Sequence, residues 1–381
     1  MTTAVKTRKP KKKKKQLKSG DYMIFILVMG LVIFGVVMIF SASYYSALSK
    51  TGNPYEYLID SVKWAVVGTC ALLAASTIPL DWYRKVAYPG VFIGLVLLLL
   101  IFTPLGKDSH GAVRWLAVGP ITIMPGEFAK AFAILFVARW LSDDPKRIQK
   151  GLGLKGIIPV GVVMVTYVAL ILKQPNMSTA MTVAMIMCGM MFVAGLKLYW
   201  LPVVAGLGGV ACWVLLTMPG AEYRLQRYTS FLDPFADPLG AGYQVVQGML
   251  AMGSGGLTGV GLGQSIQKTL YLPEPQNDFI FAIIGEELGF IGCFALMLVY
   301  MVLIWRCCHI SLNAPDLFSM LLASGITIML AAQVLLNIAV VTSCMPPTGI
   351  ILPFVSYGGN ALLIFMGAMG IMMKISRHSA V

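Results

Sequence analysis

The chain alternates long apolar runs with mostly short polar connections. Ten runs are each long enough, at about 17 to 25 residues, to cross a ~30 Å hydrocarbon layer as an α-helix. They cover residues 22–42, 62–80, 86–104, 125–141, 156–172, 177–196, 199–218, 279–305, 317–341 and 350–373. The runs are continuous rather than alternating with a period of two, which favours helices over a barrel. The pattern predicts an all-α fold, a polytopic membrane bundle of about ten transmembrane helices, within residues 21–381.

Composition and charge support this class and predict an orientation. Hydrophobic residues make up 58% of the 381 positions and charged residues only 12%, which is more apolar surface than a soluble core can bury. If both ends are cytoplasmic, roughly twenty Lys and Arg fall on the inner side, as the positive-inside bias requires. Nine of these lie in residues 1–20, which we expect to be a disordered cytoplasmic tail attracted to membrane lipids. No folded basic domain or aromatic interleaving accompanies this tail, so nucleic acid is not an expected partner.

Metal-binding patterns are not evident in the sequence. The seven cysteines and three histidines are scattered without metal-ligand spacing, so we predict no structural metal and no certain cofactor. A divalent cation, Mg or Mn, could assist at a phosphate site, but the sequence holds no diagnostic set of ligands for it.

Two outer connections are long, residues 105–124 and 219–278. Long loops inside a compact bundle are usually functional or disordered. The aromatic residues of the second loop and its apolar stretch 245–252 argue against disorder and predict short or re-entrant helices. Within it, GSGGLTGVGLG (253–263) supplies turns that only glycine tolerates. No strand precedes this segment and no Gly-Lys-Ser/Thr follows, so we interpret it as a hinge over the site rather than a nucleotide loop.

One group of outer polar residues straddles the start of the fourth apolar run. Arg114 and Trp115 precede the run, whereas Glu127 and Lys130 lie in its first turns. Pro125 suits a first helical turn, and Glu127 favours the positive end of the helix. Glu127 and Lys130 are three residues apart and can pair. The group is therefore either an ordinary helix start with an ion pair and an interfacial tryptophan, or a binding site for an anionic substrate.

A second group of acids lies where the second long loop enters the eighth run. Glu274 and Asp278 end the loop, and Asp278 could be no more than the N-cap of the helix. A carboxylate at such a junction is nevertheless costly to keep ionised, and this marks it as a functional candidate. Glu286 and Glu287 lie deeper in the apolar helix and must meet water or partners, Lys130 or another basic side chain being suitable.

Outer acids and bases beside aromatic groups suit a substrate with an anionic head and a lipid tail. Lys173 adds a further cation at the membrane rim, although a snorkelling lysine explains it equally. Two classes remain on the residues alone: an enzyme acting on a lipid-linked substrate, or a carrier that moves one. The halves of the chain show no convincing repeat, which weighs modestly against a carrier.

Three segments carry a resemblance to a known family: GAVRWLAVGPITIMPGEFAK, LPEPQNDFIFAIIGEELGFIG and NIAVVTSCMPPTGIILPFVSYGGNALL. With them the chain, apart from its lysine tail, resembles the SEDS (shape, elongation, division and sporulation) family, which contains FtsW, RodA and SpoVE. The resemblance implies a peptidoglycan glycosyltransferase that polymerises lipid II into glycan strands at the outer face of a bacterial cytoplasmic membrane. It also implies a class B penicillin-binding protein and other divisome proteins as partners. The LPEP and FVSYGG sequences are more similar to those of FtsW and SpoVE than to those of RodA. This similarity suggests a role in cell division or sporulation.

The resemblance suggests roles for individual residues. The essential aspartate of the family motif PE…DFIFA falls on Asp278. The Arg-Trp pair of the family's first outer loop falls on Arg114 and Trp115. The Glu and Lys of its QPSE…K pattern fall on Glu127 and Lys130.

Other positions in the same regions are further candidates or departures. Glu274, Ser356 and Lys173 join the candidates for substrate binding. The family's QPSE reads Met-Pro-Gly-Glu here, and the acid of its QPD turn is replaced by Asn176. The family's His-Thr-Asp reads Gln276, Asn277 and Asp278 here. Its SYGGSS pattern ends here with Asn360 and Ala361.

Glycan polymerisation joins the 4-hydroxyl of one sugar to the anomeric carbon of another, with a lipid pyrophosphate as leaving group. Asp278 is the candidate base, because partial desolvation can raise the pKa of a carboxyl toward neutrality. For the pyrophosphate, Arg114 is the first choice and Lys130 the second, and Trp115 offers a flat face for a sugar or lipid. The other outer cations are Lys173, Arg224, Arg227 and Lys268. A lipid II flippase gated by the same acids, and a purely structural division scaffold, stay as alternatives.

Overall fold

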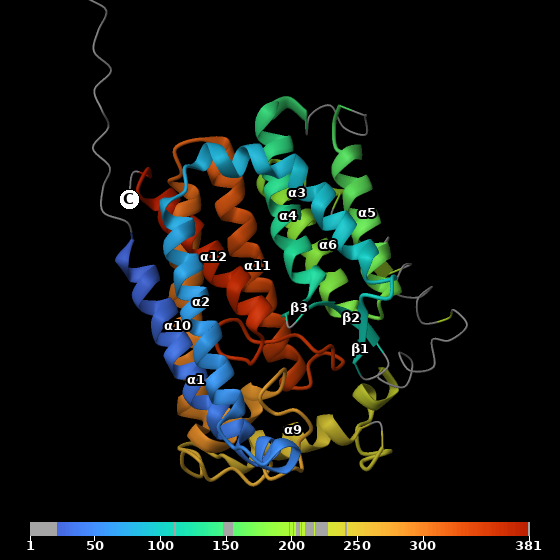
Figure 1. The fold of residues 1–381 in the computed structure, drawn as a ribbon, viewed down its shortest axis with the longest axis vertical. Helices are drawn as coiled ribbons and strands as arrows, with labels where there is room; N and C mark the ends of the chain where they lie inside the picture. Colours follow the sequence, from blue (N-terminus) through green and yellow to red (C-terminus); the bar gives the residue numbers. More distant parts are fainter. Residues whose placement is uncertain are drawn as a thin grey trace, which may run out of the picture.

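The computed structural model describes residues 21–109, 112–119, 121–147, 155–197, 228–240 and 242–379, with single positions between 199 and 217. Most of this chain is helical, and Figure 1 shows the long helices running side by side in one bundle. The tail 1–20, most of the predicted span 199–218, and Arg224 and Arg227 lie outside the described residues.

Among the described residues, nine helices correspond to predicted apolar runs, which confirms the polytopic helical fold. They are α1 (Tyr22–Thr51), α2 (Glu56–Thr77), α3 (Leu80–Leu100), α4 (Pro125–Asp143), α5 (Ile158–Lys173), α6 (Met177–Val193), α10 (Ile280–Leu312), α11 (Leu317–Val341) and α12 (Gly359–Ser376). A 3₁₀ turn, η1 (Pro145–Arg147), follows α4. In the described part of the chain, α1, α2, α3, α10, α11 and α12 are long and apolar enough to cross a membrane, and α5 and α6 are shorter apolar helices.

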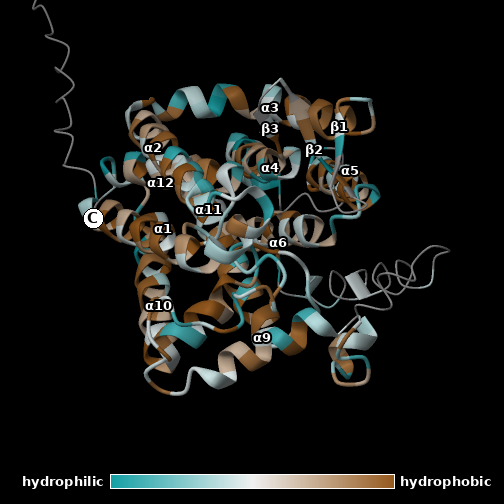
Figure 2. Ribbon diagram, turned by 60° about the horizontal axis from the view of Figure 1, so that its bottom comes forward, coloured by the Kyte–Doolittle hydropathy of each residue, from teal (hydrophilic) through white to brown (hydrophobic). Residues whose placement is uncertain are grey.

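The central helix of the bundle is α11. It packs against α4, α6, α10 and α12, and it is apolar on nearly every face, as a helix surrounded by others should be. The pairs α2–α12, α3–α4, α5–α6 and α1–α10 complete the bundle around it. Figure 2 shows apolar residues along most of the helices, with hydrophilic positions mainly at helix ends and connections.

The last helix begins later than predicted, at Gly359 rather than at residue 350. Pro353 lacks an N–H and keeps the residue before it out of the helical region, and Phe354 has a left-handed φ of 67°. Residues 344–358, which we call the connecting segment, therefore run in an irregular path between α11 and α12.

Two small elements lie at one end of the bundle. A three-stranded antiparallel sheet, which the sequence analysis missed, consists of β1 (Gly106–Ser109), β2 (Ala112–Val118) and β3 (Ile121–Ile123). The short helix α9 (Tyr243–Ser254) confirms the predicted helix in the second long loop. Figure 1 places both away from the start of α1 and the end of α12, which meet where Asp21 N donates to Ser376 Oγ at 3.1 Å. Following the charge bias, we call the end with α9 and the sheet the outer end.

A break in α10 explains the glycine-rich segment 253–263. Gly289 has φ 66° and ψ −167°, which interrupts the helix and leaves two carbonyls and two amides without their helical partners. The glycine segment pairs with all four, at 2.9 to 3.1 Å: Val260 N to Glu286 O, Gly261 N to Glu287 O, Phe290 N to Gly256 O and Ile291 N to Leu257 O. Unpaired backbone groups are costly at membrane depth, so this pairing fixes the segment on α10 instead of leaving it as the predicted hinge.

The close approach of the two backbones generates a testable prediction. Gly259 has φ 81°, and a Cβ added there would overlap the carbonyl of Glu287. Gly259→Ala should therefore destabilise the protein by about 1 to 3 kcal/mol, seen as a lower thermal unfolding midpoint in detergent. The control is Gly253→Ala in α9, where no atom lies within 4 Å of the new Cβ and the midpoint should not fall. Equal midpoints for the two variants would contradict the pairing.

Candidate active site

Asp278 lies in the turn that leads into α10 and is partly buried. Its backbone carbonyl accepts a hydrogen bond from Asn337 Nδ2 of α11 at 2.8 Å, and the same nitrogen donates to Ile350 O at 2.6 Å. A Cβ added to Gly349 would stand 3.8 Å from Asp278 Oδ2, so the carboxylate faces the connecting segment. The N-cap of α10 is Phe279, not Asp278. The aspartate thus lies where α10, α11 and the connecting segment meet.

Lys130 is buried in the bundle rather than exposed at its outer surface. Its side chain is 2% exposed, and its ammonium lies 2.8 Å from the carboxylate of Glu127, which confirms that these two residues pair. The same ammonium donates to Gln333 Oε1 of α11 at 2.9 Å. Lys130 is therefore not the partner of Glu286 or Glu287, contrary to one suggestion from the sequence.

One face of α11 connects the lysine to the aspartate. Gln333 and Asn337 are four residues apart, so their side chains lie on the same face, about 6 Å apart along the helix. Gln333 holds Lys130, and Asn337 holds the carbonyl of Asp278. The buried Lys130 pair consequently lies about one helical turn deeper than the entrance to α10.

Arg114 is connected to the segment that Asp278 faces. It lies on β2, and its Nη2 donates to the carbonyl of Pro175 at 2.6 Å. The next residue, Asn176, caps α6 by accepting an amide three residues on at 3.2 Å, so the amide in place of the family's acid acts as a helix cap. Ser178, in the first turn of α6, donates through its hydroxyl to the carbonyl of Thr348 in the connecting segment. The sheet, α6 and the connecting segment thus form one continuous support.

Trp115 and Lys173 are less closely tied to this support. Trp115 follows Arg114 on β2, opposite Lys107 of β1. The register shifts between Lys107 and Asp108, so Arg114 is the extra residue of a β-bulge, a feature that redirects side chains. Lys173 is exposed, and its ammonium lies 5.0 Å from the ring centroid of Phe102, as expected for a lysine at the membrane rim.

Glu274 and Ser356 have local partners. Glu274 forms an ion pair with Lys50 at the end of α1 at 2.5 Å, and it accepts hydrogen bonds from the side-chain amides of the two residues before Asp278. Ser356 Oγ accepts the amide of Leu352 at 2.8 Å, which stabilises a turn of the connecting segment.

Tyr357 joins the approach to Asp278 to a second helix, a contact that the sequence analysis missed although it quoted the surrounding FVSYGG block. The amide of Tyr357 donates to the carbonyl of Gln276 at 2.9 Å, and its hydroxyl donates to Asp60 of α2 at 2.7 Å. Burial and the hydrogen bond to the Asp60 carboxylate raise the pKa of Tyr357 well above its usual range. The hydroxyl therefore stays protonated and keeps donating at physiological pH.

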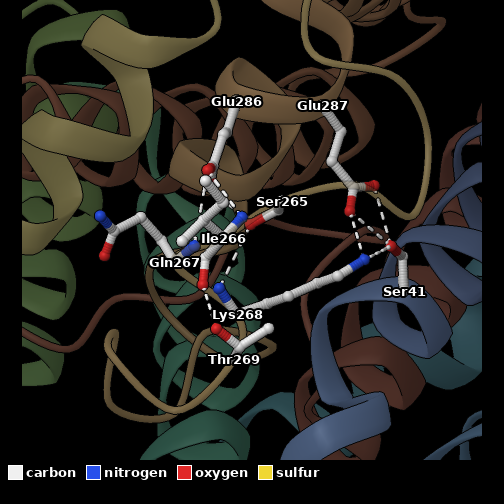
Figure 3. A network of polar contacts seen from close by, with 8 residues as sticks. All are labelled: Ser41, Ser265, Ile266, Gln267, Lys268, Thr269, Glu286 and Glu287. Carbon is white, nitrogen blue, oxygen red and sulfur yellow. Dashed lines mark hydrogen bonds and ion pairs between the residues drawn. The ribbon is translucent and has the colours of Figure 1, made fainter.

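The two glutamates inside α10 find their partners in the second long loop and in α1. Glu287 is paired with Lys268 at 2.7 Å and accepts the hydroxyl of Ser41, whereas Glu286 accepts the hydroxyl of Ser265. Figure 3 shows the two carboxylates pointing to these different neighbours. The sequence named Lys268 only as an outer cation, because nothing in its spacing indicates which acid it meets.

The described residues form no metal site made of protein ligands alone. Among the residues that the structure describes, no three His, Cys, Asp or Glu side chains come together. Mg²⁺ is usually held by one or two carboxylates together with water and substrate phosphates, so this result concerns only a site built from protein ligands alone.

Comparison with known proteins gives a consistent result over nearly the whole chain. The family FTSW_RODA_SPOVE, described as "Cell cycle protein", matches residues 21–381. The chain is 39% identical over 362 residues to Stage V sporulation protein E of Bacillus subtilis, covering 95% of this chain and 98% of that protein. It is 38% identical over 363 residues to the probable peptidoglycan glycosyltransferase FtsW of Trichlorobacter lovleyi, covering 95% and 94%.

Solved structures share the fold. A chain in a structure described as the structural coordination of polymerization and crosslinking by a peptidoglycan synthase complex has a TM-score of 0.76 at 26% identity, covering 95% of this chain and 98% of that one. The rod shape determining protein RodA of Thermus thermophilus has a TM-score of 0.69 at 25% identity, with the same coverage.

The buried pair on α4 generates a prediction about stability. Lys130→Met leaves the carboxylate of Glu127, 4% exposed, without its cation. Breaking a buried pair in this way costs about 3 to 5 kcal/mol, whereas removing both charges is far less costly. In detergent, the thermal midpoint should therefore fall strongly for Lys130→Met and recover when Glu127→Gln is added. The exposed Lys173→Met serves as control, and a similar midpoint for Lys130→Met and Lys173→Met would refute the pairing.

Proposed function

This chain belongs to the FtsW/RodA/SpoVE family of cell cycle proteins, and from that premise we propose that it polymerises lipid II into glycan strands, with Asp278 as the general base. It is a multi-pass membrane protein of the bacterial type and a peptidoglycan glycosyltransferase of cell wall synthesis. The observation that carries the residue assignment is the position of Asp278, where α10, α11 and the connecting segment converge.

The reaction needs a base for the attacking hydroxyl and positive charge for the leaving pyrophosphate. The 4-hydroxyl oxygen of one saccharide attacks the anomeric carbon of the other, and the bond from that carbon to the lipid pyrophosphate breaks. The proton of the hydroxyl passes to the Asp278 carboxylate, and the pyrophosphate leaves with the bonding electron pair. General-base assistance of this kind gives about 10²- to 10⁴-fold in rate.

Arg114 is the proposed contact for the pyrophosphate. Its planar guanidinium carries five N–H donors in a fork that matches phosphate oxygens. Its position on β2, linked through α6 to the connecting segment, supports this assignment. Lys130 is engaged with Glu127 and Gln333, so we assign it a supporting role: it holds α4 against α11 beneath the site.

The setting of the reaction follows the same premise. We place the site on the outer face of the cytoplasmic membrane, because the charge bias assigns that side to α9 and the sheet. A solved relative that belongs to a peptidoglycan synthase complex supports a class B penicillin-binding protein as partner. Other divisome proteins are further proposed partners. A divalent cation, if one takes part, would draw most of its ligands from the substrate pyrophosphate, because the described residues offer no acidic cluster for it.

Transport of lipid II is the less favoured alternative. Relatives that match nearly the whole chain carry the name of a glycosyltransferase. The two functions can also be separated by experiment. A polymerase makes glycan strands from lipid II in detergent, where there is no membrane for a transporter to move it across.

Replacing the base tests the proposal. Asp278→Asn keeps the size of the side chain but cannot accept the proton, so polymerisation of lipid II by purified protein should fall by about 10²- to 10⁴-fold. The control is Asp316→Asn, at the opposite end of the bundle, where the aspartate caps α11 and asparagine caps equally well. Asp278→Asn protein that polymerises at near the parental rate would exclude the assignment.

Replacing the proposed phosphate contact is a separate test. Arg114→Gln removes the charge but leaves donors for the carbonyl of Pro175, so the fold should persist. Binding of a lipid pyrophosphate analogue, measured by competition, should weaken by about 10-fold or more, as expected for loss of a charged hydrogen bond. An unchanged affinity would remove Arg114 from the site.

A further inference from the structure

Two consecutive buried glutamates stand just before the break in α10. Glu286 is 1% exposed and Glu287 is fully buried. Successive residues of an α-helix point about 100° apart, so the two carboxylates meet different parts of the protein. Neither belongs to the reaction proposed above, and burying two acids is costly unless each is fully hydrogen-bonded.

Glu286 holds a turn of the second long loop. Its carboxylate accepts the hydroxyl of Ser265 at 2.5 Å and the amide of Ile266 at 2.9 Å. Hydrogen bonds to a carboxylate are among the stronger ones in proteins. The turn that begins at Ser265 is thus fixed against α10.

Glu287 connects the same loop to α1. Lys268 Nζ donates to Glu287 at 2.7 Å and to Ser41 Oγ at 3.0 Å, while Ser41 Oγ itself lies 2.7 and 2.8 Å from the two oxygens of Glu287. Lys268 is 3% exposed. Figure 3 shows the extended lysine reaching from the loop to both partners. One closed triangle of contacts therefore joins the loop, α10 and α1.

The ion pair closes a short loop of chain around the proposed base. Lys268 lies ten residues before Asp278, and Glu287 lies nine residues after it. Between these two points, Tyr357 holds the carbonyl of Gln276 and Asn337 holds that of Asp278. Two different elements, the connecting segment and α11, thus hold the segment that carries the aspartate, and the buried ion pair anchors both of its ends.

We infer that Lys268 and Glu287 are positioning residues, which set the location of Asp278 through the clamp that they form with Ser41. This inference rests on the proposed function. A buried ion pair adds little net stability over an apolar pair of similar volume, yet it is satisfied in only one arrangement. Its contribution here is geometric, and a displacement of about 1 Å at a reacting group can cost up to 10²-fold in rate.

Glu287→Gln tests the clamp, with Arg306→Gln as matched control. Arg306 is also on α10 and pairs with Asp21, at the start of α1, at 2.5 Å. The control therefore breaks a link between the same two helices at the opposite end of the bundle. We expect Glu287→Gln to lower kcat for lipid II polymerisation by about 10- to 100-fold with KM nearly unchanged. Arg306→Gln should lower the thermal midpoint and leave kcat unchanged.

A double variant separates position from stability. Lys268→Met with Glu287→Gln removes both charges, so the thermal midpoint should recover while kcat stays low. A purely structural pair would instead show both quantities recovering together, which would refute the inference. If Glu287→Gln does not fold, Ser41→Ala keeps the ion pair, removes its bridge to α1, and should lower kcat in the same direction; parental kcat in that variant would also refute the inference.

Hydrogen exchange keeps this test independent of the enzymatic one. In Glu287→Gln, the amides of the non-proline residues within 270–278 should exchange faster than in the parent, and in Arg306→Gln they should not. Parental protection of these amides in folded Glu287→Gln would overturn the clamp, whatever the activity. A parent chain that makes no glycan strands would instead overturn the proposed function and leave the exchange result valid.

Discussion

Charged and backbone groups that are buried among apolar helices must find partners inside the protein, and this constraint shapes the region around α10. The break at Gly289 frees four backbone groups, and the glycine-rich segment pairs with all of them. Glu286 and Glu287 bring two carboxylates to the same depth, and residues 265–268 with Ser41 supply their donors. The glycine-rich segment and residues 265–268 are consequently fixed against α10 and α1.

The proposed site follows from that arrangement. After its contacts with α10 and α1, the loop leads into the start of α10 at Asp278. Asn337 and the connecting segment meet it there. A second buried pair, Glu127 with Lys130, lies about one helical turn deeper and is held by the same face of α11. Preorganised supports of this kind suit a reaction in which a base must stand at a fixed distance from a sugar hydroxyl.

The sequence predicts the elements better than the contacts between them. Nine of the ten apolar runs correspond to helices among the described residues, and the three-residue spacing of Glu127 and Lys130 correctly predicts their pairing. Three features of the structure could not be predicted from hydropathy or residue spacing. The start of α12 is set by Pro353 inside an apolar run, the sheet around Arg114 is too short to give a periodic signal, and the partner of Glu287 comes from nineteen residues away in the chain. Contacts made across a loop depend on the path of the backbone, which hydropathy does not encode.

The central claim is that the Asp278 carboxylate receives the proton of the attacking hydroxyl. A structure of the protein with a non-reactive lipid II analogue in the acceptor position tests this most directly. The account predicts the 4-hydroxyl oxygen of the acceptor sugar within about 2.6 to 3.2 Å of a carboxylate oxygen of Asp278, or linked to it through one water. An acceptor bound in a competent pose with its hydroxyl facing another residue would contradict it.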